Sequence, residues 1–161
     1  MSLFENDEYR WRETYFVLFD AKHCPNAEKI EKAIQQLNPH YKLSDVRHDE
    51  ADRLESLTVF FPDDYAAMDI TYTCGEEVIE QIPELMDELK GSGLSATEKL
   101  KLQKLSHCDA RFDIYHFGQV VGGSEEEDEM LDPGSLLVVL EKLAKLCKGV
   151  GVDPQSGTLI D

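Results

Sequence analysis

The residues best suited to chemistry in this chain are His23 and Cys24, which stand directly before Pro25. An aromatic and β-branched run at 13–19 precedes them, and apolar residues recur at helical spacing over 27–37. Cys24 would therefore lie between a central strand and a helix whose first turn contains Pro25. A helix N-terminus stabilises a thiolate through its dipole and its free N–H groups. This placement predicts a thiol of lowered pKa, with His23 as a neighbouring base.

The placement of Cys24 resembles that in thiol enzymes of the glutaredoxin and arsenate-reductase kinds, which often follow the cysteine with proline. The resemblance implies a thiol-dependent enzyme. Two features of those enzymes are missing, because Ala27 stands where a second cysteine would and no proline precedes a later strand. A helix-capping turn with an incidental cysteine is the competing interpretation.

His107 and Cys108 repeat the same dipeptide and raise the question of a zinc site. Structural zinc sites usually place two ligands two to four residues apart in each half, and adjacent residues chelate poorly. Cys74 and Cys147 lie on apolar faces of their segments and are more simply small core residues. We therefore expect no metal site and no cofactor.

An acidic run occupies residues 125–129, followed by Asp132 and Pro133. A calcium-binding EF-hand loop spaces its ligands alternately around a central glycine, and this run does neither. Mutual repulsion favours an exposed loop instead. Asp132 is predicted to cap the helix that follows.

The only tryptophan, Trp11, stands between Arg10 and Arg12. Exposed, the three residues would anchor a protein partner, because tryptophan and arginine are enriched at binding hot spots. Buried, Trp11 would close one end of the core. We favour the buried position, because tryptophan is highly buried on average.

The composition limits the partners of the chain. Its 161 residues carry a formal net charge of −17, which repels nucleic-acid phosphates and anionic membranes. No apolar run approaches the roughly 20 residues of a membrane helix, and the N-terminus has no secretory pattern. The four scattered cysteines fit reduced thiols and a cytoplasmic protein. A protein partner or self-association is therefore expected.

The order of elements along the chain predicts an α+β fold. The periodicities indicate β-α-β-β-β-α-α-β-α-β, ending in a small hairpin around 153–157. We expect a mostly antiparallel sheet with helices packed chiefly on one face, built from a ferredoxin-like β-α-β-β element and a C-terminal α/β extension. Residues 1–161 are predicted to form one domain, and any seam would fall at 91–93.

Together these patterns favour a non-catalytic, cytoplasmic protein that binds a protein partner or assembles with itself. The surface used would be a sheet face or an edge strand, because the strands carry more aromatic side chains than one core needs. The alternative is a thiol-dependent enzyme that uses Cys24.

Overall fold

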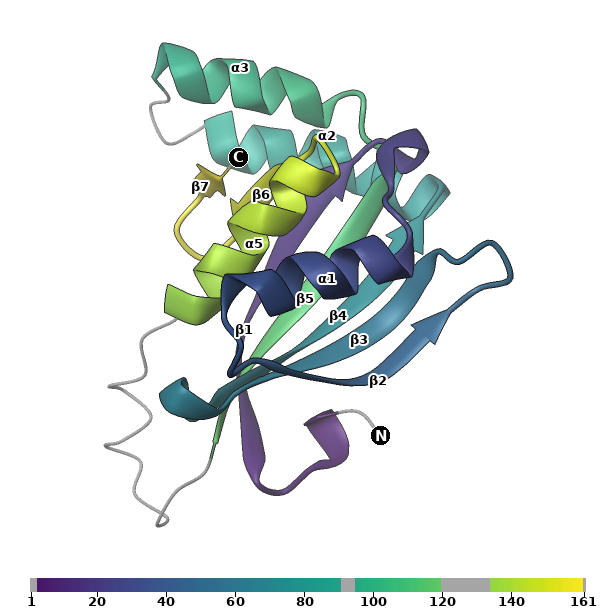
Figure 1. Cartoon of the computed structure of the whole chain (residues 1–161). Helices are drawn as coiled ribbons and strands as arrows, with labels where there is room; N and C mark the ends of the chain where they lie inside the picture. The colour runs from purple at the N-terminus through teal and green to yellow at the C-terminus, as the bar shows by residue number, and fades with distance from the viewer. Residues whose placement is uncertain (1–2, 91–94, 120–133, 161) are drawn as a thin grey trace.

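The computed structural model describes residues 3–90, 95–119 and 134–160. Their strands form one antiparallel sheet in the order β2-β3-β4-β5-β1-β6-β7 (Figure 1). The strands are Tyr9–Phe19 (β1), Lys42–His48 (β2), Leu54–Phe61 (β3), Ala66–Cys74 (β4), Ala110–Gln119 (β5), Val150–Asp153 (β6) and Thr158–Ile160 (β7). The α+β class, the antiparallel sheet and the terminal hairpin are confirmed.

Four α-helices and three short 3-10 segments accompany the sheet in the described residues. They are Ala27–Leu37 (α1), Glu76–Lys90 (α2), Ala96–Leu105 (α3), Gly134–Leu146 (α5), Leu3–Glu5 (η1), Ala21–His23 (η2) and Pro62–Asp64 (η3). None of these helices is long and apolar enough to cross a membrane. The acidic run and Asp132 lie within 120–133, outside the described residues.

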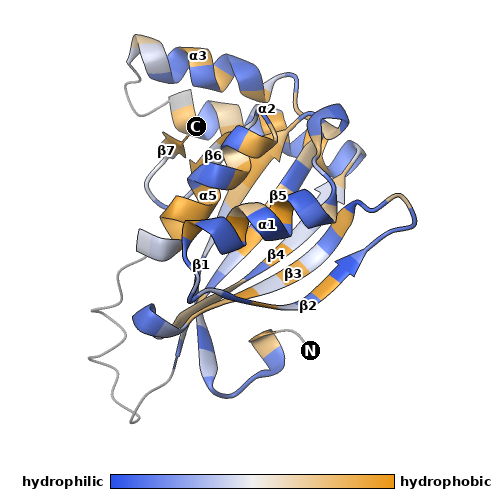
Figure 2. Cartoon of the chain, viewed as in Figure 1, coloured by the Kyte–Doolittle hydropathy of each residue, from blue (hydrophilic) through white to orange (hydrophobic). Residues whose placement is uncertain are grey.

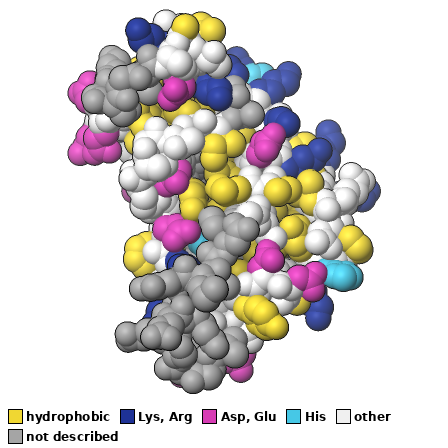
Figure 3. Space-filling view, turned by 90° about the vertical axis from the view of Figure 1, so that its left-hand side faces the viewer, with side chains coloured by type: hydrophobic (Ala, Val, Ile, Leu, Met, Phe, Trp, Pro, Cys, Tyr) yellow, Lys and Arg dark blue, Asp and Glu magenta, His cyan; other side chains and the backbone are white. Residues whose placement is uncertain are grey.

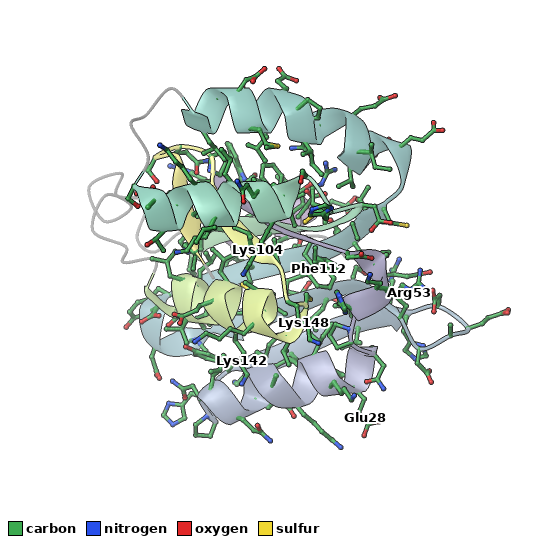
Figure 4. The ribbon with its side chains drawn as sticks, turned by 90° about the horizontal axis from the view of Figure 1, so that it is seen from above. Glu28, Arg53, Lys104, Phe112, Lys142 and Lys148 are labelled. Carbon is green, nitrogen blue, oxygen red and sulfur yellow. The ribbon has the colours of Figure 1, made fainter. Side chains whose placement is uncertain are left out.

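The helices divide between the two faces of the sheet, so the prediction that they pack chiefly on one face was wrong. Val17 and Phe19 of β1 pack with α1 and α5, whereas Leu18 packs with α2 and α3. Figure 2 shows the apolar inner sides of α1 and α5 against the central strands, and Figure 4 shows Phe112 lying beneath the helices. The physical reason is that β1 is apolar at consecutive positions. Apolar side chains therefore point to both faces of the sheet, and helices must bury each of them.

The ferredoxin-like element is not confirmed. Residues 9–61 do run β1-α1-β2-β3, but β4 and β5 separate β3 from β1 in the sheet. β5 follows residues 91–93 in the chain and lies between β4 and β1, so both sides of this segment contribute to one sheet.

Side-chain caps set the N-terminal boundaries of α1 and α3. Asn26 caps α1 by accepting a hydrogen bond from the Lys29 amide, so Pro25 stands outside the helix instead of in its first turn. Ser95 and Glu98 form a capping box at the start of α3. α2 continues across Pro83 as one helix, although proline removes a helical hydrogen bond there.

Candidate functional site

The structure gives little support to a thiol site at Cys24. The side chain is half-buried and its Sγ lies 3.4 Å from the Pro25 carbonyl oxygen. Burial raises the pKa of the Cys24 thiol, and the nearby Arg53 only partly opposes this. The predicted lowering of this pKa was therefore wrong. The helix N-terminus does not help, because the cap at Asn26 separates Cys24 from α1.

His23 and the other cysteines do not complete such a site. His23 is half-buried in η2, and its amide donates to the Asp20 carbonyl. Burial raises the pKa of Cys108 to about 12 and also raises that of Cys147. In the described part of the chain, no group of three or more His, Cys, Asp or Glu side chains is placed to hold a metal ion.

Trp11 is exposed, contrary to the buried position that we favoured. Its side chain is 47% accessible, and the indole Nε1 donates to the Thr14 hydroxyl at 3.1 Å. The pairing of β1 with β5 shifts register between Trp11 and Glu13, which marks a β-bulge at Arg12. A bulge changes the face to which the following side chains point. Arg10 is exposed and Arg12 half-buried, so the three interaction candidates lie at an accessible part of the sheet.

The two faces of the sheet differ in how completely they are covered. On the face of α1 and α5, Ile70, Ile114 and His116 are buried. Their neighbours on the opposite face, Thr71 and Tyr115, keep part of their surface accessible. We call the part of this second face that α2 and α3 do not cover the open face.

Aromatic side chains gather on the open face. Trp11 pairs with Phe117 across β1 and β5, and Tyr115 follows on the same side of β5. Phe4 of η1 lies edge-on to both rings of β5, with centroid distances of 4.8 Å to Phe117 and 5.3 Å to Tyr115. Phe4 itself is mostly exposed. These four residues form the aromatic cluster of the open face.

A groove of about 470 Å³ lies beside the aromatic cluster, over β2, β3 and β4. It contains three carboxylates and one guanidinium, and its remaining lining is mostly hydroxyl-bearing. The residues are Glu5, Asp45, Arg47, Ser56, Leu57, Thr58, Asp69, Ile70 and Thr71. We call it the sheet groove. It is polar and acidic, whereas the adjoining cluster is apolar.

Asp69 joins the groove to the N-terminal segment. Its carboxylate accepts a 2.5 Å hydrogen bond from the Thr58 hydroxyl and a 3.0 Å hydrogen bond from the Leu3 amide. Leu3 packs against Ala67 and Phe117 beneath it. Asp69 therefore holds η1, and with it Phe4, against the sheet.

Arg111 and Asp113 connect the open face to α2. The Arg111 Nε lies 2.7 Å from the Asp113 Oδ1, and the guanidinium also donates to Gln81 of α2. The same guanidinium lies 5.7 Å from the centre of the Phe16 ring. Burial raises the pKa of Asp113, and Arg111 opposes that rise. This ion pair is well placed to fix the edge of the open face.

His116 lies on the covered face and is a satisfied core histidine. Its Nδ1 is 3.1 Å from the Glu13 carboxylate, which also accepts a hydrogen bond from the Tyr15 hydroxyl at 3.0 Å. Burial lowers the pKa of His116 and the Glu13 carboxylate partly offsets this, so the neutral ring is favoured. The group contains no nucleophile beside the histidine.

The sequence predicted Trp11 with its arginines and an aromatic sheet face as interaction candidates, but neither Phe4 nor the sheet groove. Phe4 and the sheet groove come together only through the fold, since Leu3 and Asp69 are far apart in sequence. No family model, curated protein or solved structure matches this chain. Its function is therefore inferred from the geometry of its own surfaces.

Proposed function

We propose that the protein is a non-catalytic, cytoplasmic binding protein whose open face receives a basic segment of a partner protein. The observation that supports this most is the exposed Trp11 within the aromatic cluster, directly beside the acidic sheet groove. Aromatic anchors supply much of the binding energy at protein interfaces, and a charged rim selects the partner.

The charge of the site indicates the kind of partner. Glu5, Asp45 and Asp69 outnumber Arg47 along the groove, and the whole chain carries a net charge of −17. An acidic segment would be repelled both by the groove and by the net charge of the chain. A segment that contains lysine or arginine would be attracted from a distance. The apolar cluster adds a requirement for aliphatic or aromatic side chains beside the basic ones.

The binding surface is also held in place before the partner arrives. Trp11 is fixed by its hydrogen bond to Thr14, and Phe4 is fixed through η1, Leu3 and Asp69. Side chains that are already ordered lose less conformational entropy on binding. The thiol-enzyme alternative has no comparable support, since Cys24 does not line the sheet groove.

Nuclear magnetic resonance titration of the full chain tests the proposal. The probe is an amidated hexapeptide of alternating arginine and leucine, and its control alternates glutamate and leucine. We expect the arginine peptide to shift the Trp11 indole N–H and the amides of Thr71 and Tyr115, and added salt to weaken the effect. Trp11→Ala should weaken binding roughly tenfold, a typical loss for a hot-spot residue.

Two further variants separate charge from packing. Asp45→Asn and Glu5→Gln should each reduce affinity for the arginine peptide at low salt, whereas Val138→Ala on α5 should change nothing. Equal binding of the glutamate peptide, or shifts confined to residues outside the open face, would contradict the proposal.

A further inference from the structure

Two thiols that are far apart in the sequence lie at the same end of the sheet. Cys24 stands between η2 and α1, and Cys74 is the last residue of β4. Figure 1 shows the link from η2 to α1, the turn between β2 and β3 and the end of β4 gathered at one end of the sheet. Cys24 is half-buried, whereas Cys74 is exposed, although its apolar strand face had indicated a core position. Cys74 is therefore the more accessible thiol of the two.

Asp109 fixes the backbone on both sides of this thiol pair. The Ala21 amide, three residues before Cys24, donates a 2.8 Å hydrogen bond to the Asp109 carboxylate. The Gly75 amide, directly after Cys74, donates a 2.9 Å hydrogen bond to the Asp109 carbonyl oxygen. One residue thus connects the segment of each cysteine to the start of β5.

Arg53 approaches both cysteines from a third segment, the turn between β2 and β3. A β-bridge pairs it with Asn26, two residues after Cys24. Its guanidinium carbon lies 5.8 Å from the centre of the Tyr72 ring, and Figure 4 shows Arg53 near the start of α1. Tyr72 and Cys74 are two residues apart in β4, so their side chains point to the same face of the sheet. Arg53 therefore lies between the segments that carry the two thiols.

The groups around this pair influence one another electrostatically. Burial raises the pKa of the Cys24 thiol, the Arg53 guanidinium lowers it, and Asp49 and the Cys74 thiol raise it further. Burial also raises the pKa of Tyr72, and the Cys74 and Cys24 thiols add to that rise. Such effects weaken with distance. The two sulfur atoms are therefore near each other, with Tyr72 and Arg53 beside them.

We propose that Cys24 and Cys74 form a reversible disulfide when the protein meets a low-molecular-weight disulfide such as oxidised glutathione. The Cys74 thiolate first attacks one sulfur of the small disulfide, so that a mixed disulfide forms and one small thiolate leaves. The Cys24 thiolate then attacks the Cys74 sulfur, and the second small thiolate leaves. The protein dithiol loses two electrons and two protons. The small disulfide takes up both and becomes two thiols.

The environments of the two cysteines suit this order of steps. Attack on a free reagent requires an accessible thiol, which favours Cys74 over Cys24. In the second step Cys24 is already held beside the mixed disulfide, and this proximity compensates for its raised pKa. Cys147 is also near Cys24, but its side chain is fully buried and no reagent reaches it. Cys24 is thus the second thiol of a cross-link and not the nucleophile of an enzyme.

Oxidation of the fully reduced chain with oxidised glutathione tests this inference. The products are alkylated, digested without reduction and analysed by mass spectrometry. We expect a monomer that is lighter by two hydrogen atoms and a pair of peptides joined through Cys24 and Cys74. The oxidised chain should melt several degrees above the reduced one, because the cross-link restricts the unfolded chain. A disulfide to Cys108 or Cys147, a disulfide between two chains, or no protein disulfide at all would overturn the proposal.

Variants separate the two steps. Cys24→Ser should stop at the mixed disulfide on Cys74, and Cys74→Ser should slow the reaction with glutathione roughly tenfold or more. Cys108→Ala should be oxidised like the original chain, because Cys108 packs with α2 and α3 on the other face.

A second control moves the accessible thiol to another part of the surface. Cys74→Ser combined with Val138→Cys places it on α5, towards the side of the molecule that faces the viewer in Figure 3. This double variant should stop at the mixed disulfide, because Cys24 is not beside α5 at that position. A protein disulfide formed as fast in the double variant as in the original chain would show that the pairing does not depend on the position of Cys74, and the proposal would fail.

Discussion

Replacing Gly149 with alanine should destabilise the fold by about 3 kcal/mol or more, because overpacking a core is costly. A Cβ at this position would lie 2.2 Å from the Leu18 carbonyl oxygen and 2.7 Å from the Phe19 Cβ. Both neighbours belong to β1, which is hydrogen-bonded to β5 on one side and β6 on the other. The backbone there cannot move away cheaply. Thermal unfolding should show a drop of roughly 10 °C.

The adjacent residue supplies the control. The residue with a positive φ after α5 is Lys148, at +55°, and not Gly149. Lys148→Gly should therefore stabilise the protein by about 1 kcal/mol, because a left-handed conformation is costly for other residues. A melting temperature of Gly149→Ala within a degree or two of the original would show that β1 and this turn do not approach so closely.

Replacing Arg111 with methionine should also destabilise the protein strongly, lowering the free energy of unfolding by about 3 kcal/mol at neutral pH. Methionine fills much of the space of the arginine stem but leaves Asp113 buried without its ion-pair partner. The loss is measured by urea unfolding. Arg47→Met removes the same charge from an exposed residue of the sheet groove and should change the free energy of unfolding by about 0.5 kcal/mol or less.

The pH dependence identifies the buried charge as the cause. Burial already raises the pKa of Asp113 above its unfolded value of about 3.9, and loss of Arg111 would raise it further. When the pKa of a carboxyl is higher in the folded than in the unfolded protein, ionisation favours unfolding. The folded protein then becomes less stable as the pH rises from the unfolded pKa through the folded pKa. The deficit of Arg111→Met should thus shrink towards pH 4, and Arg111→Met combined with Asp113→Asn should recover most of it at pH 7. A deficit independent of pH would contradict this explanation.

Local pattern was enough to predict most elements of the fold. Period-two alternation in β3 and β4, helical spacing in α1 and the capping box at Ser95 each depend on neighbouring residues. The division of helices between two faces was missed, although the consecutive apolar residues of β1 indicated it. α2 is not split at Pro83, because tertiary packing of Val78, Ile82 and Leu85 holds the helix together across the missing hydrogen bond.

The candidate site was harder to predict, because it depends on register and on long-range contacts. The bulge after Trp11 determines which face of the sheet the Trp11 side chain lies on, and no local sequence pattern predicts that bulge. The link from Leu3 to Asp69 brings Phe4 to the aromatic cluster from the far end of the chain. The prediction for Cys24 failed for a similar reason, since burial among core residues outweighs the effect of a nearby helix start.

Photo-crosslinking in the native host tests whether the open face is the binding surface. A photoreactive phenylalanine analogue is placed at Trp11, at Phe4 or, as a control, at Val138. We expect adducts with a protein that contains a basic segment, formed from Trp11 and Phe4 and lost when Asp45 and Glu5 are neutralised. Adducts of equal yield from Val138, or none from Trp11 and Phe4, would contradict the assignment of the open face as the binding surface.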